Sequence, residues 1–388
     1  MTVTPSPTRL DFARRPILVF WETTRACLLA CQHCRASAMP RALPGQLSTA
    51  EARDLIRQVV AFGRPYPVLV LTGGDCLMRP DIFELAAYAA DLGLALAMSP
   101  SVTPILDLDA IERIRRLGVK AVSISLDGAR EASHDSVRGV PGHFVETVRT
   151  LEDLVASGLK VQVNTTVMRD NAHELADVAA LVKSIGVHMW EVFFLVKVGR
   201  GVSTRAIGAD EHEDVCHFLV DASRYGFLVR TVEAPFFRRV VAWRRALPPG
   251  ADAAATFRLG SLYRQLSARL RELLGPPGER LAAQSVSTRD GKGVLFVAHD
   301  GDVFPAGFLP LALGNVRRQQ LSDVYRDSPL LQAIRRAEFA GRCGRCEFRD
   351  ICGGSRARAF ATSGDPLGED PACPYLATGE PPVPALPV

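Results

Sequence analysis

The feature that most constrains the fold is an alternation of short apolar runs with longer amphipathic segments over residues 17–235. The apolar runs occupy residues 17–21, 68–71, 94–98, 119–126, 161–167 and 190–196. Runs this short and apolar are typical of strands that are buried on both faces. Helical patterns lie at residues 49–62, 82–92, 108–117, 144–156, 172–185 and 211–225, and several of them end at a glycine.

Repeated β/α units predict a parallel sheet with helices outside it. We therefore expect an α/β fold, a partial (β/α)6 barrel of the TIM type, with its chemistry at the C-terminal ends of the strands. The predicted divisions are an N-terminal lead (1–16), the barrel (17–235), an Arg-rich helical connecting segment (236–292), a small Cys-rich extension (293–376) and a Pro-rich, disordered tail (377–388). The extension should begin with a hairpin, 293–298 and 303–305, that turns at Asp300-Gly301.

Bulk composition excludes several classes of protein. The net charge of +4 is too small to indicate a nucleic-acid partner. No apolar run approaches the roughly 18 residues that span a membrane. The polar, Pro-containing N-terminus does not resemble a secretory signal. We expect a cytoplasmic protein that binds neither nucleic acid nor a membrane.

The chain has nine cysteines, and seven of them form two groups near its ends. In a reducing cytoplasm such groups indicate metal rather than disulfides. Cys27, Cys31 and Cys34 directly follow the first predicted strand. Three thiolates can ligate three irons of a [4Fe–4S] cluster and leave the fourth iron open for a small molecule. A zinc site is the alternative, but its fourth ligand would be His33, which fits better as a ring packed beside the cluster and its cofactor.

This C-x3-C-x2-C spacing resembles that of the radical S-adenosylmethionine (SAM) superfamily. Residues 21–37 are similar to the subgroup that contains haem-biosynthesis decarboxylases and peptide-modifying enzymes. The resemblance implies that the open iron chelates SAM. One electron would then cleave SAM to methionine and a 5′-deoxyadenosyl radical, which removes a hydrogen atom from the substrate. The cofactors carry this chemistry and the protein orients them. A flavodoxin- or ferredoxin-type electron donor is also implied.

A second motif, Thr72-Gly73-Gly74-Asp75, follows the second predicted strand. The family has a Gly-Gly-Glu-type motif there that accepts the SAM ammonium group. Bare glycine lets the backbone approach a ligand closely, and Asp75 can replace Glu as the hydrogen-bond acceptor. Cys76 stands where the family usually has Pro. Two interpretations stay open for it: a neutral packing change, or a thiol near the active site.

The resemblance also implies SAM contacts after later strands. We assign Ser125 to SAM, whereas Asp127 either contacts the substrate or forms an Asp-Gly turn. Arg138 resembles a motif arginine that meets the SAM carboxylate, and a surface charge is the other interpretation. Asn164 is expected at the ribose or carboxylate. Leu195 and the residue after it would form an apolar shelf for adenine, although ordinary core packing also explains them.

The second cysteine group is Cys343, Cys346, Cys352 and Cys373. Four thiols complete one closed [4Fe–4S] cluster, and tetrathiolate zinc is the alternative. The C-x2-C-x5-C pattern with a distant fourth Cys resembles the SPASM/twitch extension of radical SAM enzymes, in which full members hold two auxiliary clusters. Cys216 lies in a helical pattern and should be a buried apolar residue.

This chain lacks most ligands for a second auxiliary cluster, because Ala306 and Ser355 stand at or near positions where related proteins have Cys. We therefore expect one auxiliary [4Fe–4S] cluster. It would accept the electron left on the substrate, relay electrons to the first cluster, or brace the domain. The first role favours a net oxidation such as decarboxylation or crosslinking.

The substrate is less constrained. Residues 236–285 hold nine Arg against three acidic residues. These arginines either bind carboxylates, as in a tetrapyrrole or an acidic peptide, or solvate helix faces. The prediction is a radical SAM oxidoreductase that acts on a tetrapyrrole, a peptide or another small molecule. The alternative is a non-catalytic iron–sulfur or zinc protein that carries electrons or serves as a scaffold. The Gly73-Gly74-Asp75 motif favours the enzyme, because a carrier has no need of a SAM pocket.

Overall fold

The computed structural model describes residues 11–248, 250–284 and 288–375. They form one ten-stranded sheet in the order β10-β9-β8-β1-β2-β3-β4-β5-β6-β7. The strands are β1 (Leu18–Glu22), β2 (Val68–Thr72), β3 (Leu96–Met98), β4 (Ala121–Ser125), β5 (Val161–Val167), β6 (Met189–Phe194), β7 (Leu228–Val232), β8 (Val294–Val297), β9 (Asp302–Phe304) and β10 (Gly314–Asn315). Strands β8 and β1 to β7 are parallel to one another, while β9 is antiparallel to both of its neighbours, β8 and β10.

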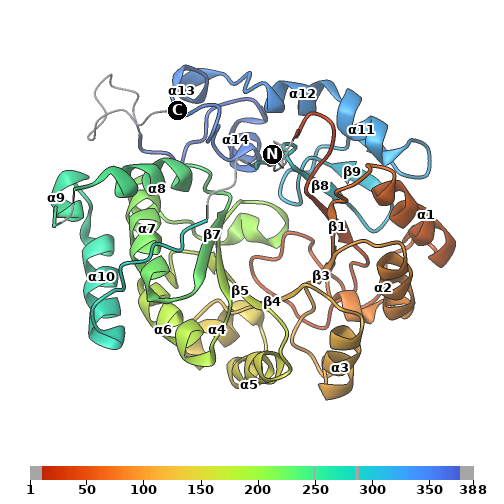
Figure 1. Cartoon of the computed structure of the whole chain (residues 1–388), viewed down its shortest axis with the longest axis horizontal. Helices are drawn as coiled ribbons and strands as arrows, with labels where there is room; N and C mark the ends of the chain where they lie inside the picture. The colour runs from red at the N-terminus through yellow and green to blue at the C-terminus, as the bar shows by residue number, and fades with distance from the viewer. Residues whose placement is uncertain (1–10, 249, 285–287, 376–388) are drawn as a thin grey trace, which may run out of the picture.

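Helices cover the outer face of this curved sheet (Figure 1). Those of the barrel are α1 (Thr49–Val60), α2 (Ile82–Asp91), α3 (Leu108–Arg116), α4 (Glu131–Arg138), α5 (His143–Ala156), α6 (Leu175–Ile185) and α7 (Ala209–Ala222). The later helices are α8 (Phe237–Ala246), α9 (Ala253–Thr256), α10 (Ser261–Leu274), α11 (Leu321–Asp327), α12 (Pro329–Arg335), α13 (Gly341–Arg345) and α14 (Arg356–Ser363). Short 3-10 helices η1 (Cys76–Met78) and η3 (Gly199–Ser203) follow β2 and β6.

All six predicted strands are present, and the expected α/β fold is confirmed. The sequence patterns missed α4 and the seventh parallel strand, β7. Arg230 interrupts the apolar run of β7 because its side chain lies on the inner face, opposite Glu191 of β6. The predicted hairpin is present as β8 and β9, but β8 also pairs in parallel with β1. The hairpin therefore extends the barrel sheet, and the domain boundaries stay a prediction.

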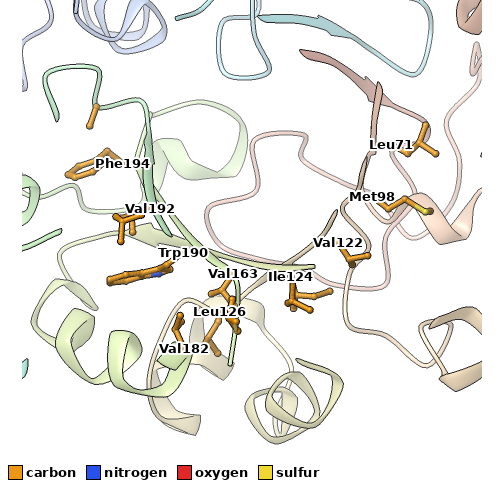
Figure 2. Close-up of a cluster of buried hydrophobic side chains, with 14 of the residues drawn as sticks. Leu71, Met98, Val122, Ile124, Leu126, Val163, Val182, Trp190, Val192 and Phe194 are labelled. Atoms are coloured by element: carbon orange, nitrogen blue, oxygen red, sulfur yellow. The ribbon is translucent and has the colours of Figure 1, made fainter. Parts of the chain in front are cut away.

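The main core lies between the sheet and its helices. Figure 2 shows apolar side chains of β2 to β6, with Val182 of α6, gathered on the outer face of the strands. Trp190 is fully buried there, and its indole N–H donates to Thr165 Oγ1 at 2.9 Å. This satisfied, close-packed layer fixes the strands and so the loops at their C-terminal ends.

The inner face of the sheet differs between its two sides. Ser125, Asn164, Glu191 and Arg230 are consecutive register partners across β4 to β7, which makes that side polar. On the other side Phe20 of β1 pairs in register with Val70 and Phe296 of the neighbouring strands. A ligand inside the barrel would thus meet one polar wall and one apolar, aromatic wall.

Within the described ranges, no helix is long and apolar enough to cross a bilayer. Most of the predicted N-terminal lead and the whole Pro-rich tail lie outside the described residues.

Candidate functional site

The loop between β1 and α1 carries the first three cysteines. Cys27 and Cys31 are buried, and together with the partly exposed Cys34 they belong to one small apolar cluster with Leu29 and Ala38. Backbone N–H groups point at two of the sulfurs, at 3.4 Å from Leu29 to Cys27 and 3.5 Å from Ala38 to Cys34. The three thiols thus lie in one small apolar cluster, and their sharing of one metal site stays a prediction.

Two glycines hold this loop against β2. The Gly74 N–H donates to the Thr24 carbonyl at 2.8 Å, and the Asp75 N–H donates to the Ala26 carbonyl at 2.7 Å. A Cβ at Gly73 would lie 2.6 Å from the Thr24 carbonyl oxygen, and one at Gly74 would lie even closer to Ala26. The bare glycines expected to admit a ligand thus also admit the cysteine loop itself. Any side chain at either position would push that loop away.

The Asp75 carboxylate is fully buried and already has three protein donors. They are the backbone N–H groups of Leu77 at 3.1 Å and Ser101 at 3.3 Å and the Thr103 hydroxyl at 3.1 Å. Burial raises the pKa of Asp75 although these hydrogen bonds lower it. Thr72, the last residue of β2, accepts through its carbonyl from the Thr23 N–H at 2.8 Å. Contact between this motif and the SAM ammonium stays a prediction.

Cys76 begins η1 and is fully buried in the main core. Burial raises the pKa of its thiol well above the usual range. The packing interpretation therefore fits Cys76 better than a reactive thiol does. Cys216 is likewise fully buried in the core, as predicted.

Arg138 ends α4 and is buried rather than on the surface. It forms an ion pair with Asp127, which also accepts the Thr166 N–H at 2.7 Å and lies 3.5 Å from His33 Nε2. Burial raises the pKa of Asp127, but the Arg138 and His33 charges outweigh it and lower that pKa overall. A second guanidinium nitrogen of Arg138 lies 3.5 Å from Cys31 Sγ. Asp127 thus positions two groups beside the cysteine cluster, a role that the motif did not reveal.

Two histidines that the sequence patterns did not indicate, His134 and His143, connect the Asp127 backbone to the Val102 carbonyl. The Asp127 N–H donates to His134 Nδ1 at 3.1 Å, which leaves the proton of that ring on Nε2. His134 Nε2 lies 2.9 Å from His143 Nδ1, and His143 Nε2 lies 3.0 Å from the Val102 carbonyl. Burial lowers the pKa of His134 to about 3, so the chain of hydrogen bonds is neutral at physiological pH.

Ser125 and Asn164 are side by side as register partners in β4 and β5. The structure therefore brings together two residues that the resemblance assigned to SAM. Asn164 accepts from Gln162 at 2.7 Å, and Gln162 also donates to Glu191 at 2.8 Å. Leu195 packs with Val137 and Met168 next to the cysteine loop. The residue after Leu195, Val196, packs instead with Leu309 and Ala357 of the extension, so the predicted two-residue shelf is divided.

Four buried donors around the cysteine loop have no partner within the described part of the chain. They are Arg25 Nε, His33 Nδ1, Arg138 Nε and Arg200 Nη2. Unpaired buried donors are costly, and three of the four belong to cations. An anionic iron–sulfur cluster with bound SAM would satisfy such a set. Nevertheless, no three Cys, His, Asp or Glu side chains in the described ranges converge as they would on a single ion, so the ligand set stays a prediction.

The second cysteine group gathers around α13 and the loops that flank α14. The Asp370 N–H donates to Cys343 Sγ at 3.4 Å, and the Gly354 N–H donates to Cys352 Sγ at 3.4 Å. Burial raises the pKa of Cys352 to about 11 and that of Cys373 to about 12, and the charge of Cys352 also raises the pKa of Cys373. The thiols of Cys352 and Cys373 are therefore neutral here, and a bound metal would have to displace their protons.

Arginines surround this second group. At the start of α8, Arg239 is buried and Arg238 is partly buried near it, and Arg289 donates to the Cys352 carbonyl at 3.3 Å. Arg356 Nη2 donates to Cys343 Sγ at 3.7 Å. Burial lowers the pKa of Arg238 to about 10. The Arg-rich segment thus has a use that was not predicted, because Arg238 donates to the Ile351 carbonyl, next to Cys352, at 2.7 Å and Arg239 forms an ion pair with Glu213 at 2.7 Å.

Ala306 and Ser355, the two departures from the family pattern, have ordinary structural roles. Ala306 is buried in the turn after β9. Ser355 caps α14, where its hydroxyl accepts the Arg358 N–H at 2.9 Å and donates to Glu233. Neither residue can ligate an iron through sulfur.

Comparison with known proteins decides the family. Residues 21–182 match the radical SAM superfamily, and residues 289–347 match an iron–sulfur cluster-binding domain, SPASM. An AdoMet-dependent heme synthase of Nitratidesulfovibrio vulgaris is 38% identical over 92% of both chains. The chain belongs to the radical SAM superfamily. A second AdoMet-dependent heme synthase, from Methanosarcina barkeri, is 33% identical over 93% of this chain and 97% of that protein. The mycofactocin maturase MftC of Mycobacterium tuberculosis is 31% identical over 92% of this chain and 83% of that protein.

Solved structures agree on the fold. SuiB of Streptococcus suis, bound to S-adenosylmethionine, superposes with a TM-score of 0.66 at 14% identity, over 93% of this chain and 78% of SuiB. The protein anSMEcpe with bound AdoMet gives 0.64 at 15% identity, over 92% and 93% of the two chains.

The chain is therefore a radical SAM enzyme with a [4Fe–4S] cluster, SAM and an auxiliary iron–sulfur centre as its cofactors. Such an enzyme requires a reductant. The comparisons give the non-catalytic alternative no support. The matched region of the cluster-binding domain contains Cys343 and Cys346 and ends before Cys352 and Cys373.

Proposed function

We propose that this radical SAM enzyme oxidatively decarboxylates a carboxylate side chain of a tetrapyrrole. The observation that carries the proposal is the similarity to AdoMet-dependent heme synthases at 33–38% identity over more than nine-tenths of this chain. A pre-heme d1 synthase of Dinoroseobacter shibae, 30% identical over 97% of this chain and 90% of that protein, supports the same substrate class.

The reaction balances with the proposed parts. Loss of one hydrogen atom and one electron from a propionate side chain releases carbon dioxide and leaves a vinyl group. When bound, the first cluster and SAM supply a 5′-deoxyadenosyl radical that takes the hydrogen atom. The electron requires an acceptor, and the auxiliary centre is the proposed one.

The chain's own residues bind and orient these groups. Cys27, Cys31 and Cys34 are the proposed ligands of the first cluster. Arg138, held by Asp127, places a positive charge beside Cys31. The proposed SAM contacts are His33, Thr72, Gly73, Gly74, Asp75, Ser125, Arg138, Asn164 and Leu195.

Cys343, Cys346, Cys352 and Cys373 are the proposed ligands of a single auxiliary [4Fe–4S] cluster. The buried cations Arg239, Arg289 and Arg356 and the partly buried Arg238 lie around them. Positive charge stabilises the reduced, more negative state of a cluster, which suits an electron acceptor. We further propose a flavodoxin- or ferredoxin-type electron donor and a cytoplasmic location.

The second candidate is oxidative modification of a peptide. It is favoured by the mycofactocin maturases among the relatives, at 30–31% identity. No observation on this chain's own residues separates the two candidates, so the test includes both kinds of substrate.

The test is anaerobic reconstitution with iron and sulfide, followed by addition of reductant and SAM. We expect about eight irons per chain, from two four-iron clusters, and formation of 5′-deoxyadenosine. Iron coproporphyrin III should increase the amount of 5′-deoxyadenosine, and each modified side chain should lose one carbon dioxide and two hydrogens, about 46 Da in total. A peptide library that stimulates turnover while tetrapyrroles do not would replace the first candidate with the second. Alanine at Cys27, Cys31 and Cys34 should abolish cleavage and leave the auxiliary cluster.

A further inference from the structure

Four phenylalanines lie on or over the aromatic side of the barrel interior. Phe20 and Phe296 are register partners in β1 and β8 and share the inner face. Phe193 of β6 and Phe308, after β9, lie 6.1 Å apart between ring centroids with their planes tilted by 56°. Phe20, Phe193 and Phe308 are only partly buried. These rings form an apolar wall that spans strands from both ends of the curved sheet.

Arg35 stands at this wall, directly after Cys34. Its guanidinium carbon lies 4.4 Å from the centroid of Phe296, and its Nη2 lies 3.0 Å from Glu22 at the end of β1. A Cβ at position 307 would lie 3.2 Å from Arg35 Nε, so Gly307 leaves the room that this guanidinium occupies. The Arg35 side chain is 18% exposed.

Glu22 orients Arg35 without enclosing it. Burial raises the pKa of Glu22, but the Arg35 charge and the neighbouring His299 lower that pKa overall, so Glu22 is ionised. His299 Nδ1 lies 3.3 Å from the second carboxylate oxygen. One guanidinium nitrogen therefore meets a carboxylate, and the opposite edge stays open to a ligand.

The neighbouring arginines, Arg200 and Arg138, already bind other groups of the protein. Arg200 donates to the carbonyls of Cys31 at 2.9 Å and Ala38 at 2.8 Å, and Arg138 is paired with Asp127. Arg35 has a single polar partner among the described residues, Glu22, and an accessible side chain. Arg138 and Arg200 each keep one unpaired donor atom, but both atoms are buried, so Arg35 is the one of these three arginines with an accessible guanidinium to offer to a substrate.

We infer that Arg35 and the surrounding phenylalanines bind a carboxylate carried by a flat, apolar ring system. A guanidinium binds a carboxylate through parallel hydrogen bonds, while the aromatic faces pack against the ring. The inference rests on the proposed function and deepens it, because it locates the substrate. The position of Arg35, one residue from Cys34, places the bound ring beside the radical-generating centre.

The experiment titrates the reconstituted holoenzyme with SAM present, following the Soret band of the probe. The probes are iron coproporphyrin III and its tetramethyl ester, both in the same mild detergent. We expect the acid to bind at least about tenfold more tightly than the ester, because a charge-assisted hydrogen bond is worth about 1.5–3 kcal/mol. Arg35→Gln should lower the affinity for the acid by about 10- to 100-fold and leave the affinity for the ester unchanged.

Two variants control for indirect effects. Arg41→Gln removes an exposed arginine of the same loop and should leave both affinities unchanged. Phe308→Leu should lower the affinity for the acid and the affinity for the ester by the same factor. Iron content and the cluster spectrum of each variant show whether the site has assembled, and the acid–ester comparison on the unaltered enzyme needs no variant.

Equal binding of acid and ester, or equal loss for both probes in Arg35→Gln, overturns the inference and leaves the proposed function standing. If neither probe binds while a peptide stimulates 5′-deoxyadenosine formation, the proposed function fails and the inference fails with it. A selective loss of acid binding in Arg35→Gln supports both.

Discussion

Replacing Asp127 with Asn tests the buried ion pair between Asp127 and Arg138 beside the first cysteine group. The side chains of Asp127 and Arg138 are 1% and 8% exposed, so the substitution leaves a buried cation without its counter-charge. Breaking a buried pair in this way costs about 3–5 kcal/mol. Asn keeps an oxygen for the Thr166 N–H, which confines the change mainly to the charge.

This cost converts into a measurable melting shift. The entropy of unfolding is about 2.1 cal/mol/K per residue, or about 0.8 kcal/mol/K for this chain. We therefore expect Asp127→Asn to lower Tm by about 4–6 °C in cluster-free, reduced protein. The shift should be smaller after reconstitution, because an anionic cluster near Cys31 would supply part of the missing negative charge.

The assay is anaerobic calorimetry at pH 6 and pH 8. The pKa of Asp127 is lowered in the folded state, so its stabilising effect is complete above its unfolded pKa and is lost only as pH falls through the folded value. The shift should therefore be equal at the two pH values. Asp170→Asn, which breaks an exposed pair with Arg205, is the matched control and should change Tm by no more than about 1 °C. If Asp127→Asn behaves like this control, the argument from burial is wrong.

Four further variants test the two cysteine groups and the residues packed near them. Gly74→Ala should displace the loop at Ala26 and reduce bound iron to about four atoms per chain, measured by iron analysis and electron paramagnetic resonance. Cys343→Ala should also leave about four irons per chain but keep SAM cleavage. Cys76→Ala should keep all of the bound iron, because Cys76 is a core residue. Loss of iron in Cys76→Ala would contradict this packing role. Burial raises the pKa of Glu213, but the Arg239 charge outweighs this effect and lowers that pKa to about 2. Ionised Glu213 therefore stabilises the folded state above its unfolded pKa of about 4.5, and this stabilisation is lost as pH falls toward 2. Glu213→Gln should flatten this part of the acid-denaturation curve of the cluster-free protein, and an unchanged curve would count against the pair.

The sequence predicted the barrel well because fully buried strands read as uninterrupted apolar runs. It missed β7 because a strand with Arg230 on the inner face breaks such a run. The three cysteines and the Gly73-Gly74 motif were found because their chemistry depends on local spacing. The burial of Arg138 could not be found in this way, since it depends on how α4 packs its last residue against Asp127. The same holds for Arg238, whose contact with the Ile351 carbonyl at 2.7 Å joins segments more than a hundred residues apart.

The parallel pairing of β1 with β8 has a consequence for biosynthesis. The ribosome makes β1 first, yet one edge of that strand stays open until Val294–Val297 emerges. An open strand edge is prone to wrong pairing. The loop that carries Cys27 follows this same strand. The loop therefore reaches its final position only when most of the chain has been made. Cluster insertion at the first site should therefore be post-translational, and chains that stop before β8 should aggregate rather than accept iron.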